Sequence, residues 1–232
     1  MNIKAVIFDV DNTLYNYDAA HAAAFEALCD TARQRLGLDA EAFTALYDRA
    51  MEIQVQRAGE DAAAIHNRLL RFQIMAEELR QPLTLAPELS ECYWSVFLEA
   101  MEPFPGLCQC LRALKEKGYR LGIGTNMTAD FQYEKLRRLN VLELLDFIVT
   151  SEEVNAEKPH EKLFRFCAAK AGCRMEECVF VGDSLSHDAR GAAQAGMVPV
   201  WLCPDPGRKV EGVRKISSLQ ELPGLLESGG FF

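Results

Sequence analysis

Apolar residues follow two different patterns along the chain, and the change comes near Pro103. Before that proline, apolar side chains recur every three or four positions, which is typical of amphipathic helices. After it, short apolar runs rich in β-branched residues alternate with helical stretches, as in sheets whose strands are joined by helices. The helical stretches before Pro103 are expected near residues 25–36, 43–53, 65–79 and 89–100. The pattern therefore predicts a helical part and a mixed α/β part.

The mixed part includes the start of the chain, because residues 3–8 form an apolar run without Gly or Pro that indicates a buried strand. Further strands are expected over residues 119–125, 147–150, 178–182 and 197–202. More than a hundred residues separate the first two strands, whereas a βαβ unit takes ~30 residues. We therefore expect an α/β core with a parallel sheet, formed by residues 1–16 and 103–232 and interrupted by a four-helix cap domain at 17–102.

Composition narrows the class of partner. The 232 residues carry a formal net charge of -9, whereas proteins that bind nucleic-acid polymers usually present a basic face. No apolar stretch reaches the ~18 residues of a membrane span, and no charged segment precedes a long apolar run as in a signal peptide. The eight cysteines are scattered, which favours reduced thiols. We expect a cytoplasmic protein that binds neither a nucleic-acid polymer nor a membrane. The oligomeric state stays open.

Polar side chains follow four of the predicted strands, at or just beyond the point where each strand ends. They are Asp9 and Asp11 after the first strand, Thr125 and Asn126 after the second, Lys158 beyond the third, and Asp183, Ser184 and Asp188 after the fourth. Each group alone is a weak signal, since Asp, Thr and Asn are common in turns and helix caps. Because the carboxyl ends of parallel strands lie at one edge of a sheet, the four groups can converge. Their combination predicts one active site.

This combination of side chains fits phosphoryl transfer. The carboxylates of Asp9 and Asp183, with a backbone carbonyl, make the hard oxygen site that Mg²⁺ prefers. Lys158 and the hydroxyl of Thr125 can hold phosphate oxygens. One carboxylate of the first pair can attack phosphorus and form an aspartyl phosphate. The other can protonate the leaving oxygen and later deprotonate water.

At these positions the chain resembles the haloacid dehalogenase superfamily of phosphohydrolases. The segments that carry the resemblance are Asp9-Val10-Asp11-Asn12-Thr13, Thr125-Asn126, Lys158-Pro159 and Val181-Gly182-Asp183-Ser184-Leu185-Ser186-His187-Asp188. Their order, their spacing and the predicted strands before them all match. The resemblance implies a Rossmann-like core with strand order 5-4-1-2-3 and a helical cap inserted after the first strand.

The resemblance also implies a role for each of these residues. Asp9 would be the nucleophile and a magnesium ligand. Asp11 would be the general acid and base, with its backbone carbonyl on the metal, and Asp183 would be a further ligand. The residues that bind the phosphoryl group would be Thr125, Asn126 and Lys158. The residues that support the metal site would be Ser184 and Asp188.

The implied function is a magnesium-dependent phosphatase of a small phosphorylated metabolite, either a nucleotide 5'-monophosphate or a sugar phosphate. The dehalogenases of the superfamily need no metal and lack an acid at the position of Asp11, so phosphoryl chemistry is favoured. A phosphomutase of the same fold and a non-catalytic phosphate-sensing protein are the alternatives. In the cap we expect Arg68 and Arg71 to lie on a solvated face beside acidic residues, although arginine also suits a second anionic group on a substrate.

Overall fold

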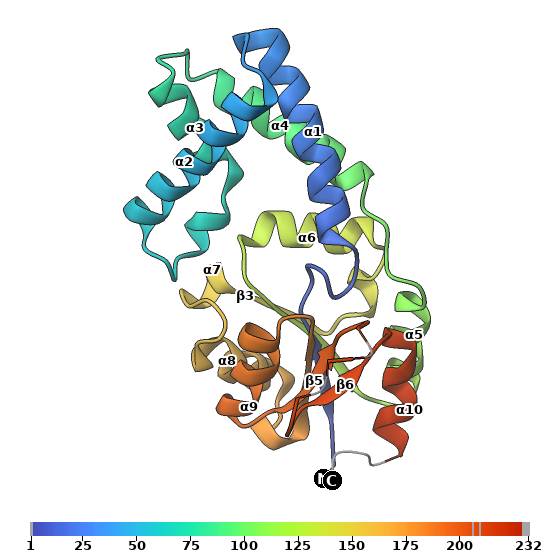
Figure 1. Ribbon diagram of the computed structural model, residues 1–232. Helices are drawn as coiled ribbons and strands as arrows, with labels where there is room; N and C mark the ends of the chain where they lie inside the picture. The colour runs from blue at the N-terminus through green and yellow to red at the C-terminus, as the bar shows by residue number, and fades with distance from the viewer. Residues whose placement is uncertain (1, 206, 209, 229–232) are drawn as a thin grey trace. The chain divides into compact units, whose positions relative to one another are not determined.

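In the computed structural model, residues 2–205, 207–208 and 210–228 are described. The chain divides into two compact units. One unit joins Met1–Asn16 to Pro103–Phe232, and the other is formed by Tyr17–Glu102. Figure 1 shows that the strands belong to the first unit and that the second is built from helices.

The first unit is built on a parallel sheet with the strand order β3-β2-β1-β4-β5-β6. The strands are β1 (Ala5–Phe8), β2 (Arg120–Thr125), β3 (Phe147–Thr150), β4 (Cys178–Gly182), β5 (Val198–Leu202) and β6 (Arg214–Ile216). The first five strands have the order that the sequence resemblance implied, with β1 at the centre. The prediction of an α/β fold with a Rossmann-like parallel sheet is confirmed.

The sixth strand, β6, was not predicted from the sequence. It has three residues, of which Ile216 alone is buried, and it pairs with β5 at the edge of the sheet. A run that short, with two basic residues, gives neither an apolar stretch nor a readable alternation. Its pairing with Val200–Leu202 therefore comes from the tertiary structure and could not be read from local pattern.

The register of β1 decides which residues meet at the carboxyl edge of the sheet. Phe8 lies beside Ile123 of β2 and beside Val181 of β4. All four residues of β1 are buried, which is why the strand is apolar on both faces. Because the strands are parallel, the segments that follow β1, β2 and β4 leave the sheet at the same edge. That edge carries Asp9.

Helices cover both faces of the sheet. The helices of this unit are α5 (Leu107–Glu116), α6 (Ala129–Arg138), α7 (Ser151–Val154), α8 (Glu161–Ala171), α9 (Gly191–Ala195) and α10 (Leu222–Glu227). Figure 1 shows α8 and α9 on one side of the sheet and α5 and α10 on the other. On the α8 side, apolar side chains of the sheet and of α8 and α9 form a hydrophobic core. Within it, the rings of Phe164 and Phe180 pack edge to face with their centroids 4.9 Å apart.

The apolar pattern of the sequence also predicts a helix over residues 188–195, and the segment after β4 differs from it. It begins with a π-helical turn, η4 (Leu185–Arg190), and continues as α9. The Asp188 carboxylate accepts a hydrogen bond from the backbone N–H of Ser184 at 2.9 Å, and the Ser184 hydroxyl accepts one from the N–H of His187 at 3.2 Å. These side-chain bonds start the turn earlier than the apolar pattern indicates. Single π-helical turns of this kind are frequent at functional sites.

The second unit contains the four helices expected from the apolar periodicity. They are α1 (Tyr17–Leu36), α2 (Ala40–Ala58), α3 (Arg68–Glu78) and α4 (Leu85–Glu99), with a short 3₁₀ helix, η1 (Ala63–His66), before α3. Aromatic rings fill the space between them, such as Phe72 of α3 and Tyr93 of α4, whose centroids lie 6.4 Å apart. Among the described residues of the whole chain, no helix combines the length and the apolar character needed to cross a bilayer.

The expectation that Arg68 and Arg71 lie on a solvated face is wrong. Arg71 is 3% exposed and donates to the Tyr47 hydroxyl at 2.8 Å and to Gln54 Oε1 at 3.0 Å. Arg68 is buried as well and donates to the Tyr17 hydroxyl at 2.9 Å. Both arginines face the interior of the helical unit, where tyrosine hydroxyls and rings replace carboxylates as their partners.

Candidate active site

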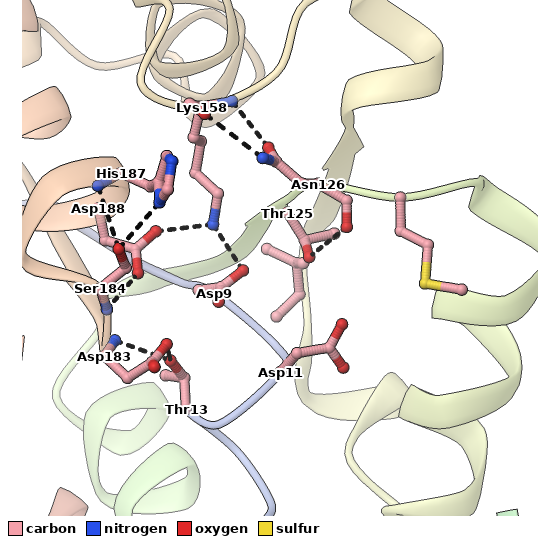
Figure 2. A network of polar contacts seen from close by, with 12 residues as sticks. Asp9, Asp11, Thr13, Thr125, Asn126, Lys158, Asp183, Ser184, His187 and Asp188 are labelled. Carbon is pink, nitrogen blue, oxygen red and sulfur yellow. Dashed lines mark hydrogen bonds and ion pairs between the residues drawn. The ribbon is translucent and has the colours of Figure 1, made fainter. Parts of the chain in front are cut away.

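Lys158 lies between two carboxylates at the carboxyl edge of the sheet. Its Nζ donates to Asp9 Oδ1 at 2.6 Å and to Asp188 Oδ1 at 2.7 Å. Figure 2 shows the three side chains pointing toward one another from three separate segments of the chain. The Lys158 and Asp188 side chains are 4% and 1% exposed. The predicted convergence of these distant residues is therefore present in the structure.

A third carboxylate joins this group. One oxygen each from Asp9, Asp183 and Asp188 lie within 4.8 Å of one another. Two hydrogen bonds fix the backbone of Asp183. Its N–H donates to the Thr13 hydroxyl at 3.1 Å, and its carbonyl accepts from Trp201 Nε1 at 2.7 Å. The sequence predicted Asp9 and Asp183 as metal ligands and Asp188 as a supporting residue. The structure brings all three together.

Asp188 lies in space that is free because Gly182 has no side chain. A Cβ at this position would be 2.3 Å from Asp188 Cγ, a distance at which one of the two residues would have to move. Ser184 holds the same carboxylate through its backbone N–H, while its hydroxyl caps the turn at His187. The predicted supporting residue Ser184 therefore contacts Asp188 through its backbone.

Negative charge exceeds positive charge in this cluster. Burial raises the pKa of Asp9 to about 7, because the opposing charge of Lys158 does not offset burial and the charges of Asp188 and Asp11 raise it further. Burial, followed by the charge of Asp188, raises the pKa of Asp183 to about 6. For Lys158, the two carboxylates outweigh burial and raise the pKa above its usual range, so the side chain stays an ammonium ion.

This arrangement fits a divalent cation. The donors are carboxylate oxygens, which Mg²⁺ prefers, and they are close enough to share one ion. The cation would also supply the positive charge that the cluster lacks. Asp9, Asp183 and Asp188 are the side chains that could hold it.

Thr125 and Asn126, at the end of β2, border the cluster in different ways. The Thr125 hydroxyl accepts a hydrogen bond from Gln132 Nε2 at 2.8 Å. The Asn126 amide binds the backbone of Lys158, accepting from its N–H at 2.8 Å and donating to its carbonyl at 3.4 Å. The next residue, Met127, has a φ of 135°, a value that favours glycine and is strained for other residues. The loop after β2 is thus tied to the loop that carries Lys158.

The Asp11 side chain does not join the cluster of Asp9, Asp183 and Asp188. Figure 2 shows its carboxylate pointing away from the group formed by Asp9, Lys158 and Asp188. Lys135 of α6 donates to both Asp11 oxygens, at 2.8 and 3.0 Å, and the Tyr15 hydroxyl donates to Oδ1. Burial alone would raise the pKa of Asp11, but Lys135 and these hydrogen bonds outweigh it and lower the pKa below its usual range. The environment of Asp9 thus raises its pKa, whereas the environment of Asp11 lowers its pKa.

Comparison with the sequence profiles of known families identifies the family of this chain. The profile described as haloacid dehalogenase-like hydrolase matches residues 3–196. The chain belongs to this family. The matched range contains every residue of the cluster, and the resemblance stated from the motifs is confirmed.

Named relatives define the enzyme class within the family. A ribulose-1,5-bisphosphate 5-phosphatase of Halopiger xanaduensis is 37% identical over 206 residues, which cover 86% of this chain and 84% of that protein. A glyceraldehyde 3-phosphate phosphatase of Methanopyrus kandleri is 35% identical over 203 residues, again 86% and 84% of the two chains. The crystal structure of a haloacid dehalogenase-like (HAD) phosphatase from Thermococcus onnurineus has a TM-score of 0.76 and 27% identity, and it covers 97% of this chain and 98% of that one. The predicted class, a phosphoric monoester hydrolase, is confirmed.

The sequence analysis did not identify the contacts that three side chains of this haloacid dehalogenase-like site make with Asp11 and Thr125. These side chains are Gln132, Lys135 and Tyr15. Gln132 and Lys135 lie three positions apart on α6, in the same stripe as the buried Leu136 and Leu139. Two polar residues within an apolar helical stripe were the available signal, because such residues are buried against a partner. The partner, Asp11, is 124 positions away from Lys135 and could not be identified from local pattern.

Proposed function

We propose that this hydrolase is a magnesium-dependent phosphatase of a small phosphorylated metabolite and that Asp9 accepts the phosphoryl group. The observation that carries the proposal is the buried Asp9 carboxylate, hydrogen-bonded to Lys158 within a group of three carboxylates. Among the described residues, Lys158 is the lysine that pairs with this group. The remaining negative charge favours a divalent cation, and cation and lysine together favour a bound phosphate.

Magnesium would be held by the side chains of Asp9 and Asp183 and by the backbone carbonyl of Asp11, with Asp188 supporting the site. When bound, it would screen the repulsion between the attacking carboxylate and the phosphate oxygens. Lys158 contributes to the same screening, because its ammonium already lies 2.6 Å from Asp9 Oδ1. The Thr125 hydroxyl and the Asn126 amide would bind the phosphate oxygens that face the end of β2.

In the first half-reaction a carboxylate oxygen of Asp9 attacks phosphorus. The new bond is the acyl phosphate bond, and the bond that breaks joins phosphorus to the leaving oxygen. Asp11 donates a proton to that oxygen, so the substrate leaves as an alcohol. The phosphate of the substrate brings negative charge close to Asp11, which favours the protonated form that this step needs.

In the second half-reaction water attacks the phosphorus of the aspartyl phosphate. Asp11, now ionised, takes a proton from the water as the new bond forms. The bond between Asp9 and phosphorus breaks, inorganic phosphate leaves, and Asp9 is restored. The same residue thus acts as acid and then as base. The environment of Asp11, which favours the carboxylate form, suits the second role.

For the substrate we propose a sugar phosphate or a nucleotide 5'-monophosphate. The relatives above are named for ribulose 1,5-bisphosphate and glyceraldehyde 3-phosphate, both phosphate esters of short polyhydroxylated carbon chains. These names favour the sugar phosphates. We assign the choice between substrates to the helical unit Tyr17–Glu102, which we regard as the cap.

The experiment is a panel of ribulose 1,5-bisphosphate, glyceraldehyde 3-phosphate, uridine 5'-monophosphate and dinitrophenyl phosphate, each with Mg²⁺ and with a chelator. We expect free phosphate from at least one alkyl ester in Mg²⁺, no turnover in chelator, and none in Asp9→Asn. Asp48→Asn, which changes an exposed aspartate of α2, is the control and should keep full activity. Turnover in Asp9→Asn would contradict the proposal. An isomerised sugar phosphate in place of free phosphate would indicate a phosphomutase.

A further inference from the structure

Lys135 is a completely buried lysine whose ammonium faces the proposed acid and base. Its Nζ lies 2.8 Å from Asp11 Oδ1 and 3.0 Å from Asp11 Oδ2, so one ammonium donates to both oxygens of one carboxylate. The same Nζ lies 3.3 Å from Met127 Sδ, a weak acceptor next to the end of β2. The contact is therefore a two-point ion pair between a buried lysine and a carboxylate whose side chain is 27% exposed.

Two further side chains act on the same carboxylate. The Tyr15 hydroxyl donates to Asp11 Oδ1. Gln132, one turn before Lys135 on α6, lies 3.5 Å from Asp11 Oδ2 and donates to the Thr125 hydroxyl at 2.8 Å. Side chains of α6 thus contact both the segment after β1 and the end of β2. The plane and direction of the Asp11 carboxylate are fixed by groups that belong to this helix and to the loop after β1.

Such a fixed direction matters for proton transfer. A carboxylate on a short side chain can rotate, and a displacement of ~1 Å can cost a reaction on the order of 100-fold. A buried ammonium is costly to keep in a protein unless it is paired and hydrogen-bonded. A purely apolar residue would fill the same space on the α6 stripe without that cost. The pairing with Asp11 is a reason for the presence of a lysine here.

We propose that Lys135 is a positioning residue that holds the Asp11 carboxylate in one direction, apart from Asp9, for proton transfer to the leaving oxygen. In an in-line displacement that oxygen departs on the side of phosphorus opposite the attacking Asp9. The inference rests on the proposed function, in which Asp11 is the acid and base. Lys135 does not touch the substrate in this account. It acts through Asp11, and its removal should therefore matter for those reactions in which the leaving oxygen needs a proton.

Leaving groups separate this role from a structural one. An alkoxide is a poor leaving group and depends on the acid, whereas dinitrophenolate leaves without a proton. The value of kcat/KM reports the steps through the first transfer, so it isolates the acid role from the later attack of water. We expect Lys135→Met to lower kcat/KM at least ~10-fold for the most rapidly hydrolysed alkyl ester of the panel above. For dinitrophenyl phosphate the change should stay below ~3-fold.

A double-mutant cycle tests whether Lys135 acts through Asp11. Asp11→Asn should show the same selectivity for leaving groups, and Lys135→Met added to Asp11→Asn should cause no further loss with the alkyl ester. Lys135→Arg keeps the charge and should recover part of the alkyl ester activity. Lys162→Met, which changes an exposed lysine of α8, is the matched control and should behave as the wild type. Thermal unfolding of each variant confirms that it is folded.

The results that overturn the inference are distinct from those that overturn the proposed function. Equal losses with both leaving groups, additive losses in the cycle, or a gain in alkyl ester activity would each contradict a positioning role for Lys135. If Lys135→Met does not fold, Lys135→Arg supplies the test: a selective loss supports the inference, and an unselective one contradicts it. Asp9→Asn that still hydrolyses the esters, or no turnover of any alkyl ester by the wild type, would instead reject the proposed function and this inference with it.

Discussion

The charge imbalance around Asp9 predicts that the metal-free protein loses stability as the pH rises. The pKa of Asp9 is raised from 3.8 to about 7 in the folded protein. A carboxyl group with a raised pKa binds its proton more tightly in the folded state than in the unfolded state. Its contribution to the free energy of unfolding is therefore complete below pH ~4 and is lost as the pH rises to about 7. One pKa unit corresponds to ~1.4 kcal/mol, so the whole effect is on the order of 4 kcal/mol.

Urea unfolding in chelator at pH ~5.5 and ~7.5 samples about half of this effect, or ~2 kcal/mol, because the loss stops near the folded pKa. Other groups titrate in the same window. The pKa of His21 is lowered by burial and by the charges of Arg68 and Arg71, so its contribution rises with pH and opposes that of Asp9. Burial raises the pKa of Asp183 to about 6, so its contribution falls with pH as that of Asp9 does. Asp9→Asn keeps His21 and Asp183 and removes the Asp9 titration, so the difference between wild type and variant isolates Asp9.

We expect the wild type to lose ~2 kcal/mol relative to Asp9→Asn between the two pH values in chelator. Saturating Mg²⁺ should remove most of that loss, because a bound cation favours the ionised carboxylates. Parallel behaviour of wild type and Asp9→Asn in chelator would refute the argument that Asp9 is short of positive charge. A pH dependence that Mg²⁺ leaves unchanged would refute the assignment of the cation to this cluster.

Three further substitutions give separate tests. Gly182→Ala places a Cβ 2.3 Å from Asp188 Cγ, so Asp188 should move. The increase in melting temperature that Mg²⁺ causes should therefore be smaller in this variant than in the wild type. An unchanged increase would contradict the close fit between Gly182 and Asp188. Gly224→Ala, on α10 with open space around the added carbon, should raise the free energy of unfolding by ~0.5–1 kcal/mol, and a loss would show that the space is not open. Arg71→Met removes the donors to the Tyr47 hydroxyl and to Gln54 Oε1 and should cost ~2–4 kcal/mol in urea unfolding. A change below ~0.5 kcal/mol would mean that the pairing contributes little.

The core fold could be predicted because each strand carries a local pattern. Strands such as β1 and β4 are buried on both faces, so they appear in the sequence as uninterrupted apolar runs. The edge strand β6 has no such run, and its pairing with β5 follows from tertiary contacts. The convergence of Asp9, Lys158 and Asp183 could be predicted for a related reason: parallel strands place their carboxyl ends at one edge.

The surroundings of Asp11 and of the buried arginines of the helical unit could not be predicted in the same way. Lys135 and Arg71 are long charged residues, which are exposed in most proteins, and their burial depends on partners far away in the sequence. Local pattern places them on a helical stripe but does not tell what lies opposite. For Lys135 the opposite group is a proposed catalytic carboxylate, and for Arg71 it is a tyrosine hydroxyl.

The central claim is that Asp9 carries the phosphoryl group, and chemical trapping tests it most directly. Asp11→Asn should accumulate the intermediate with dinitrophenyl phosphate and Mg²⁺, because the leaving group needs no acid while the attacking water lacks its base. Acid quenching followed by borohydride reduction converts an aspartyl phosphate to homoserine, which peptide mass spectrometry locates. The account predicts homoserine at position 9. Homoserine at another aspartate, or an unmodified position 9 in a variant that releases dinitrophenolate in a burst, would contradict it.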